Sequence, residues 1–369
     1  MRKIKAKKIF DGSKILENAV IIFDEKEIKY IGKDNGKETE ETFEAEFVTP
    51  GFIDLSSGIG LKEESLPEVE GDDFNEETNP KTPELLAIDG INPLDEAFPK
   101  ALMGGITSTL VLPGLSNPIG GQGAFIKTQG KTVEEMLIKS ACGMRFSLNE
   151  APKITYGQQK KMPMTRMGSA YIIRKALYEA KGDAGKKGKE KAASLEKKSL
   201  LKVLNREEKA FFAAFRADDI ATAIRISKEF NLKTVITFGT EADITMKMLK
   251  ENKIPVAFGP VILPRFNNEL KHLSPEVPAT LMENGIETAI ISGHPYYPAE
   301  FLRIQLGLII AEGIKPETAL ASITSVPAKI LGFKNRGIIK KGAKPDIALF
   351  DGVPWETKTK VVKVFVSKQ

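Results

Sequence analysis

The feature that most constrains this sequence is the alternation of short apolar runs with helical patterns through its middle. Uniformly apolar runs are typical of strands buried on both faces of a parallel sheet. Eight such strands that alternate with helices predict an α/β fold of the (β/α)8 barrel type. The predicted strands are residues 51–55, 106–112, 123–128, 143–148, 210–215, 234–238, 255–259 and 288–292.

Helix signals lie between several of these strands. Thr132 and Glu135 have the spacing of a capping box at the start of a helix. The segment 217–231 places apolar residues on one helical face, and its pattern ends at Asn231. Further helices are predicted before Gly285 and before Gly313, where glycine ends the apolar pattern.

Both ends of the chain are rich in β-branched and aromatic residues. The first 48 residues contain "KAKKIF", "NAVIIFD" and "EIKYIG", and the C-terminal part contains "PDIALFDG" and "KTKVVKVFVSK". Turn residues separate these runs, as in strands joined by short connections. Because the two β-rich ends flank a different middle, we expect them to pair into one small β-domain.

The content of histidine and cysteine limits the chemistry. The 369 residues include two histidines, His272 and His294, and one cysteine. Histidine is the commonest side chain in metal binding and in general base catalysis, so imidazole-based chemistry has little room here. A single cysteine permits no internal disulfide, which is typical of a cytoplasmic protein.

Charge and hydropathy exclude two classes of partner. The formal net charge is +5, from 54 basic and 49 acidic residues of mixed distribution, which does not predict nucleic-acid binding. No apolar run reaches the ~18 residues of a membrane span. A small-molecule ligand and a homo-oligomer both remain possible partners.

Two segments depart from the alternation of strands and helices. They are an acidic loop at 63–80 and a Lys-rich segment at 181–202, whose role is not predicted.

Several motifs resemble one protein family. "VTPGFID" at 48–54 is similar to the first-strand motif PGFIDxHxH of the amidohydrolase superfamily, whose members are metal-dependent hydrolases of C–N bonds such as those of cyclic amides. The segment 79–130 and the motifs "RADDI", "FGTEAD" and "SGHP" resemble an imidazolonepropionase-related branch, and "GIIKKGAKPDIALFDG" at 337–352 resembles the usual C-terminal motif. The resemblance implies a distorted (β/α)8 TIM-type barrel over 49–334 and a composite β-sandwich from 1–48 and 335–369.

The same resemblance shows that most metal ligands of the family are missing. The first-strand HxH pair falls on Ser56 and Gly58, and the eighth-strand aspartate falls on Gly293. The remaining histidine positions fall on Ala213, Phe215, Phe238 and Asp243. A two-metal hydrolase needs several nitrogen or oxygen ligands around its ions, and phenylalanine donates none. We therefore predict that the chain binds no metal and no other cofactor.

Several of these residues leave two interpretations open. Lys127 matches a lysine that is carboxylated and bridges two metals in many relatives, but without metal partners a lysine paired with a nearby carboxylate is the favoured interpretation. Asp243 is either a ligand or the N-cap of the next helix. Asp54 either packs or lines a pocket, and His294 is either structural or in contact with a ligand. Ser56 lacks a nearby base and is a weak candidate nucleophile.

Two functions follow from this set. The first is a superfamily member that has lost metal-dependent catalysis, a pseudoenzyme that acts as a binding or structural protein. The second is an active hydrolase with an atypical, metal-poor site around Lys127, Asp243 and His294. The catalytic residues are unknown in either case.

Overall fold

The computed structural model describes residues 1–64, 70–182 and 194–368. Parts of the acidic loop and of the Lys-rich segment, 65–69 and 183–193, lie outside the described residues, so the Lys-rich segment keeps no assigned role. In the described part of the chain, no helix has the length and apolar character needed to cross a membrane.

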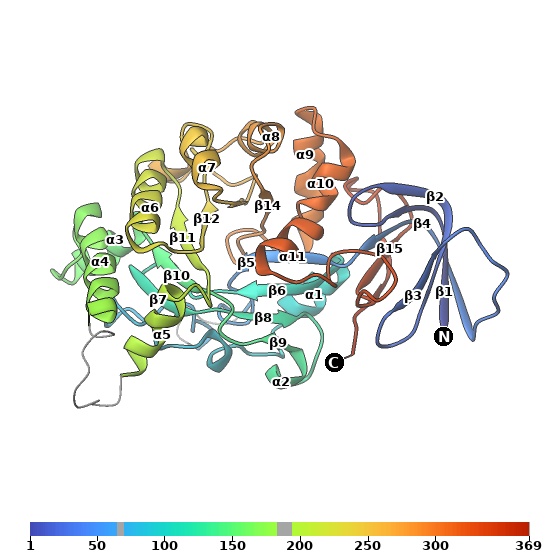
Figure 1. Ribbon diagram of the computed structural model, residues 1–369, viewed down its shortest axis with the longest axis horizontal. Helices are drawn as coiled ribbons and strands as arrows, with labels where there is room; N and C mark the ends of the chain where they lie inside the picture. Colours follow the sequence, from blue (N-terminus) through green and yellow to red (C-terminus); the bar gives the residue numbers. More distant parts are fainter. Residues whose placement is uncertain (65–69, 183–193, 369) are drawn as a thin grey trace.

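Strands from both ends of the chain pair in one six-stranded sheet, which we name the terminal sheet (Figure 1). The strand β1 (Arg2–Phe10) pairs in parallel with β4 (Glu41–Pro50) and antiparallel with β2 (Ile15–Phe23). The C-terminal strand β15 (Ile347–Phe350) pairs antiparallel with β4. The sheet has its own apolar cluster of buried residues such as Ile4, Ile21 and Val48. The order is β16 (Val361–Phe365), β15 (Ile347–Phe350), β4 (Glu41–Pro50), β1 (Arg2–Phe10), β2 (Ile15–Phe23) and β3 (Ile28–Gly32).

Two further sheets form the middle of the molecule. The larger contains β14 (Thr288–Ile290), β13 (Val256–Phe258), β12 (Thr234–Phe238), β11 (Ala210–Ala214), β10 (Met144–Ser147) and β7 (Ile119–Gln122). The smaller contains β5 (Phe52–Ser57), β6 (Ile106–Val111), β8 (Ala124–Lys127) and β9 (Leu137–Lys139). All eight predicted apolar runs overlap strands, and their residues are buried apart from the half-buried Pro255.

The two central sheets adjoin at both edges. At one edge, β7 and β8 are consecutive in the chain, and Gly123 between them exchanges backbone hydrogen bonds with the segment that leads into β10. At the other edge, the Gly58 N–H donates to the His294 carbonyl at 2.7 Å, which connects the ends of β5 and β14.

One prediction about these strands was wrong. The run 123–128 was expected to lie parallel to its neighbours, but β8 runs antiparallel to β6, and β7 runs antiparallel to β10. The apolar pattern reports burial on both faces and carries no information on direction.

Helices cover the outside of the central strands (Figure 1). The predicted capping box is present in part, since Thr132 Oγ1 accepts from the Glu135 N–H. The helix predicted to end at Asn231 does so, with Asn231 in the left-handed conformation. The helices are α1 (Ala97–Met103), α2 (Val133–Met136), α3 (Ala151–Gln158), α4 (Arg166–Gly182), α5 (Leu195–Leu204), α6 (Ala217–Phe230), α7 (Met246–Asn252), α8 (Glu276–Glu283), α9 (Gln305–Ala311), α10 (Pro316–Ala321) and α11 (Ser325–Leu331).

Candidate functional site

The carboxyl ends of β5, β11, β12 and β14 bring most of the predicted site residues to one region. Asp54 and Ser56 lie in β5, and Gly58 follows it directly. The other members lie at or just beyond the ends of their strands: Ala213, Phe215, Phe238, Gly293 and His294. Parallel strands end on one side of a sheet, which is why residues so distant in sequence meet here.

Asp54 connects the first and last strands of this region. Its carboxylate is buried and accepts hydrogen bonds from the backbone N–H of Ser292, at 3.2 Å, and from the Ser292 hydroxyl. Burial raises the pKa of Asp54 to about 6, and the Ser292 hydrogen bonds oppose the rise. Asp54 therefore fixes the end of β14 against β5.

A residue that sequence analysis missed, Arg145, lies at the centre of the site. Its Nη2 donates to Ser56 Oγ at 2.9 Å, its Nη1 to Thr237 Oγ1 at 2.8 Å, and its Nε to the Pro113 carbonyl at 3.2 Å. The guanidinium therefore spans the space between β5, β6 and β12. Among the described residues, no carboxylate lies within ion-pair distance of it.

The Arg145 charge is buried, with 2% of the residue exposed. Burial lowers the pKa of Arg145 to about 9, because removal from water disfavours the charged form. A buried charge without an opposite charge is costly, so its presence requires an explanation. The signal in the sequence was a single charged residue inside the apolar run 143–148.

One phenylalanine lies over the guanidinium, and a second stacks on the first. The ring of Phe238 lies 5.9 Å from Arg145 Cζ and stacks on Phe215 with centroids 4.6 Å apart and an interplanar angle of 10°. Phe238 also has a φ of +76°, a conformation that costs a side chain of this size ~1–3 kcal/mol. Such strain at a strand end is typical of a functional position.

The region does not fit a divalent metal. A Cβ added at Gly58 would lie 2.5 Å from the ring of Phe74, so the space for a histidine there is filled. Gly293 has a φ of +63°, and a Cβ there would lie 2.9 Å from Pro260. Within the described ranges, no group of three histidine, cysteine or acidic residues has a metal-binding arrangement.

His294 is buried beside the loop that follows β5. Neither ring nitrogen meets the distance and angle of a hydrogen bond within the described residues, although the Lys62 backbone lies near enough to influence the His294 pKa. Burial lowers the pKa of His294, and the negative charges of Glu64 and Asp95 oppose that effect. The ring is therefore neutral near pH 7.

The three residues of the hypothesis of a metal-poor hydrolase lie in different parts of the structure. Because β8 is antiparallel to β6, Lys127 pairs with Ser108 near the start of β6, at the opposite end of the strands from Gly58. Its charged neighbours are Arg336 and Asp346. Asp243 faces a different surface pocket, which His272 also lines. Asp243 does not cap α7 with its side chain either, since the helix begins after Thr245. Lys127, Asp243 and His294 therefore do not form one site.

A cavity of about 180 Å³ opens above the phenylalanine pair. Phe215, Phe238 and Tyr296 line it. Asn149 lines the cavity with a buried Oδ1 that has no hydrogen-bond partner within the described part of the chain. The other lining residues are Leu115, Glu150, Ala151, Ile154, Pro260, Leu263, Phe266, Asn267, Glu269 and Leu270. We name this cavity the strand-end pocket.

One wall of the strand-end pocket carries acidic groups. Glu269 is buried and accepts from the Glu150 backbone N–H at 2.8 Å and from Arg166 Nη2 at 3.1 Å. Arg166 also donates to the buried Asp219 at 2.7 Å. Burial raises the pKa of Glu269 to about 7 and that of Asp219 to about 6. Arg166 is therefore the ion-pair partner of two buried carboxyl groups.

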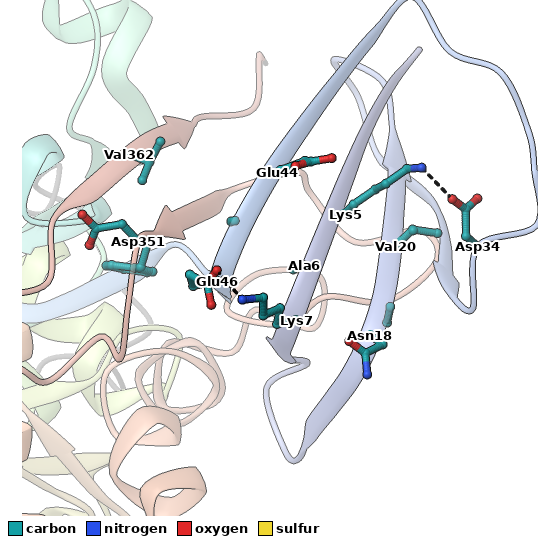
Figure 2. Close-up of a pocket in the computed structure, with 13 residues that line it drawn as sticks. Lys5, Ala6, Lys7, Asn18, Val20, Asp34, Glu44, Glu46, Asp351 and Val362 are labelled. Carbon is teal, nitrogen blue, oxygen red and sulfur yellow. Dashed lines mark ion pairs between the residues drawn. The ribbon is translucent and has the colours of Figure 1, made fainter.

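A larger groove lies on the terminal sheet and contains none of the predicted site residues (Figure 2). Its charged side chains pair with one another, Lys5 with Asp34 at 3.0 Å and Lys7 with Glu46 at 2.7 Å. The groove is shallow, and its two lysines are already paired with acidic side chains, so the strand-end pocket is the better candidate site.

Comparison with known proteins agrees with this fold. No protein-family model matches the sequence. The crystal structure of an amidohydrolase from Thermotoga maritima MSB8 is 36% identical, with a TM-score of 0.94 over 100% of this chain and 98% of that one. A prolidase complexed with N-methylphosphonate-L-proline superposes with a TM-score of 0.64 at 16% identity, over 100% of this chain and 98% of that chain, which shows the fold alone.

A curated relative gives the same result at lower identity. The amidohydrolase tasK of Hapsidospora irregularis is 26% identical over 356 residues, which cover 86% of this chain and 36% of tasK. The chain thus spans about a third of the length of that relative. The chain belongs to the amidohydrolase superfamily, mainly because of its 36% identity to the Thermotoga maritima amidohydrolase over nearly the full length of both chains.

Proposed function

We propose that this chain has lost the metal-dependent hydrolysis of C–N bonds that its superfamily performs, and that it binds a small molecule in the strand-end pocket. The observation that supports this most directly is Arg145. Its guanidinium donates to Ser56, the position at which the resemblance places the first metal ligand.

Electrostatics argues against a metal beside this residue. A divalent ion ~5 Å from the guanidinium would be repelled by about 7 kcal/mol at an effective dielectric constant of ~20. Carboxylates and imidazoles are the usual ligands of such an ion, whereas the ligand positions in this region carry serine, glycine, alanine and phenylalanine, and Asp243 faces another pocket.

The proposal includes the architecture implied by the resemblance. The two central sheets, which adjoin at both edges, are taken as the distorted (β/α)8 barrel over 49–334, and the terminal sheet as the composite domain of 1–48 and 335–369. The placement in an imidazolonepropionase-related branch is part of the same proposal and rests on the sequence motifs.

Metal analysis of the purified chain tests the loss of the metal site. We expect zinc, iron and manganese at well below one ion per chain, and an unchanged Tm after treatment with a chelator, since no folding free energy depends on an ion. A stoichiometric, tightly bound metal whose removal lowers the Tm would overturn the proposal.

A further inference from the structure

The strand-end pocket has opposite electrostatic character at its floor and at its wall. Arg145 does not itself line the pocket: it lies beneath the floor, on the far side of the Phe238 ring, as a buried cation without an anionic partner among the described residues. At the wall, Asn149 Oδ1 has no donor within the described chain, and Glu269 shares Arg166 with Asp219. The floor therefore lacks a negative group, and the wall lacks a hydrogen-bond donor.

The rest of the pocket is apolar. Phenylalanine, leucine and isoleucine side chains supply most of its remaining surface: Phe215, Phe238, Phe266, Leu263, Leu270 and Ile154. A volume of about 180 Å³ corresponds to roughly six water molecules at ~30 Å³ each, far below the pockets of drug-sized ligands. The fitting molecule is small, with an apolar part.

We propose that the strand-end pocket binds a small zwitterion, an apolar α-amino acid, with its carboxylate toward Arg145 and its ammonium group toward Asn149 and Glu269. This inference rests on the proposed function, because the guanidinium takes the place of the metal as the positive group of the site. The apolar side chain of the ligand packs against the phenylalanines.

Phe238 has a specific part in this arrangement. Its ring lies over the guanidinium and also lines the pocket, so the carboxylate reaches Arg145 only when this ring moves aside. The positive φ of Phe238 is a strained backbone state at the very residue that must move. Its stacking on Phe215 holds the closed position in the absence of ligand.

The test compares three probes by calorimetric titration of the full chain. L-Leucine has both charges, N-acetyl-L-leucine lacks the ammonium group, and L-leucinamide lacks the carboxylate. We expect L-leucine to bind at least about tenfold more tightly than either of the others, as expected for loss of a charged hydrogen bond.

Two variants assign the charges to residues. In Arg145→Gln the preference for L-leucine over L-leucinamide should disappear, and in Asn149→Leu the preference for L-leucine over N-acetyl-L-leucine should decrease. Arg174→Gln removes an arginine whose partner is Glu229 on the molecular surface, and it should bind like the parent. If Arg145→Gln does not fold, Arg145→Lys and the probe comparison on the parent decide.

The inference fails if L-leucinamide binds as tightly as L-leucine, or if no probe binds at roughly 10 mM, where even a Kd of ~1 mM would be measured. Neither result bears on the proposed loss of metal chemistry, which metal analysis decides. Absence of metal with no binding of L-leucine would therefore overturn this inference and leave the proposed function standing.

Discussion

Replacement of Arg145 by methionine separates a ligand-binding role from a structural role. Methionine has a similar length and carries no charge, so the variant removes the buried cation and keeps most of the packing. Burial lowers the pKa of Arg145 from 12.5 to about 9. At 1.36 kcal/mol per pH unit, holding this charge costs the folded chain about 5 kcal/mol.

The substitution also removes favourable interactions. It leaves the hydroxyls of Ser56 and Thr237 and the carbonyl of Pro113 without their donor. Hydrogen bonds to a charged group are worth about 1.5–3 kcal/mol each, so losing three costs at least about 5 kcal/mol and offsets the gain. We therefore expect Arg145→Met to leave the free energy of unfolding close to that of the parent in the absence of ligand. A buried charge whose removal costs so little is typical of a residue kept for function.

Arg166→Met is the matched control, because this arginine pairs with the buried Asp219 and Glu269. Its removal leaves buried carboxyl groups without their partner and should destabilise by about 3–5 kcal/mol. Thermal unfolding of the two variants beside the parent gives the comparison. If Arg145→Met lowers the Tm as much as Arg166→Met does, Arg145 is a structural residue and the reasoning is refuted.

Three further predictions concern the same site. Phe238→Ala should lower the free energy of unfolding by about 3 kcal/mol in urea denaturation, and no change would mean that the ring faces open solvent. The raised pKa of Glu269, about 7, means that the folded chain keeps a proton that the unfolded chain has released above its ordinary value of 4.5. Its contribution is therefore present at low pH and is lost as the pH rises through 7, so the Tm should fall over this range, and Glu269→Gln should flatten that profile. Restoring histidines at the first-strand pair should give no zinc binding by calorimetry unless Phe74→Ala and Arg145→Gln are added, because Phe74 fills the space at Gly58.

The strands could be predicted from the sequence because burial on both faces leaves a direct compositional mark. The run 210–215 is apolar throughout, the run 234–238 adds only threonine to apolar residues, and β11 and β12 are buried at every position. Strand direction leaves no such mark. The antiparallel course of β8 was therefore missed, and with it the position of Lys127 away from the other candidates.

The missing metal ligands of the site could be predicted from the sequence, whereas the role of Arg145 could not. Serine and glycine at the first-strand pair are visible in the sequence, since the resemblance gives the positions where histidines are expected. The new group is visible only as an arginine inside an apolar run. Its partners Ser56 and Thr237 lie 89 and 92 residues away, and no local pattern connects them.

The choice of neutral partners for Arg145 is itself an argument for an anion site. A serine hydroxyl, a threonine hydroxyl and a backbone carbonyl orient the guanidinium by hydrogen bonds and leave its charge uncompensated. A carboxylate in any of these positions would form an ion pair with Arg145 and stabilise the free chain. The same ion pair would prevent an anionic ligand from binding the guanidinium. Arg166, which has two carboxylate partners, shows the arrangement used where the arginine supports the structure. The contrast between the two arginines indicates that the charge of Arg145 is left unpaired for an anionic ligand. The unpaired charge destabilises the free chain, and binding of the ligand offsets that destabilisation.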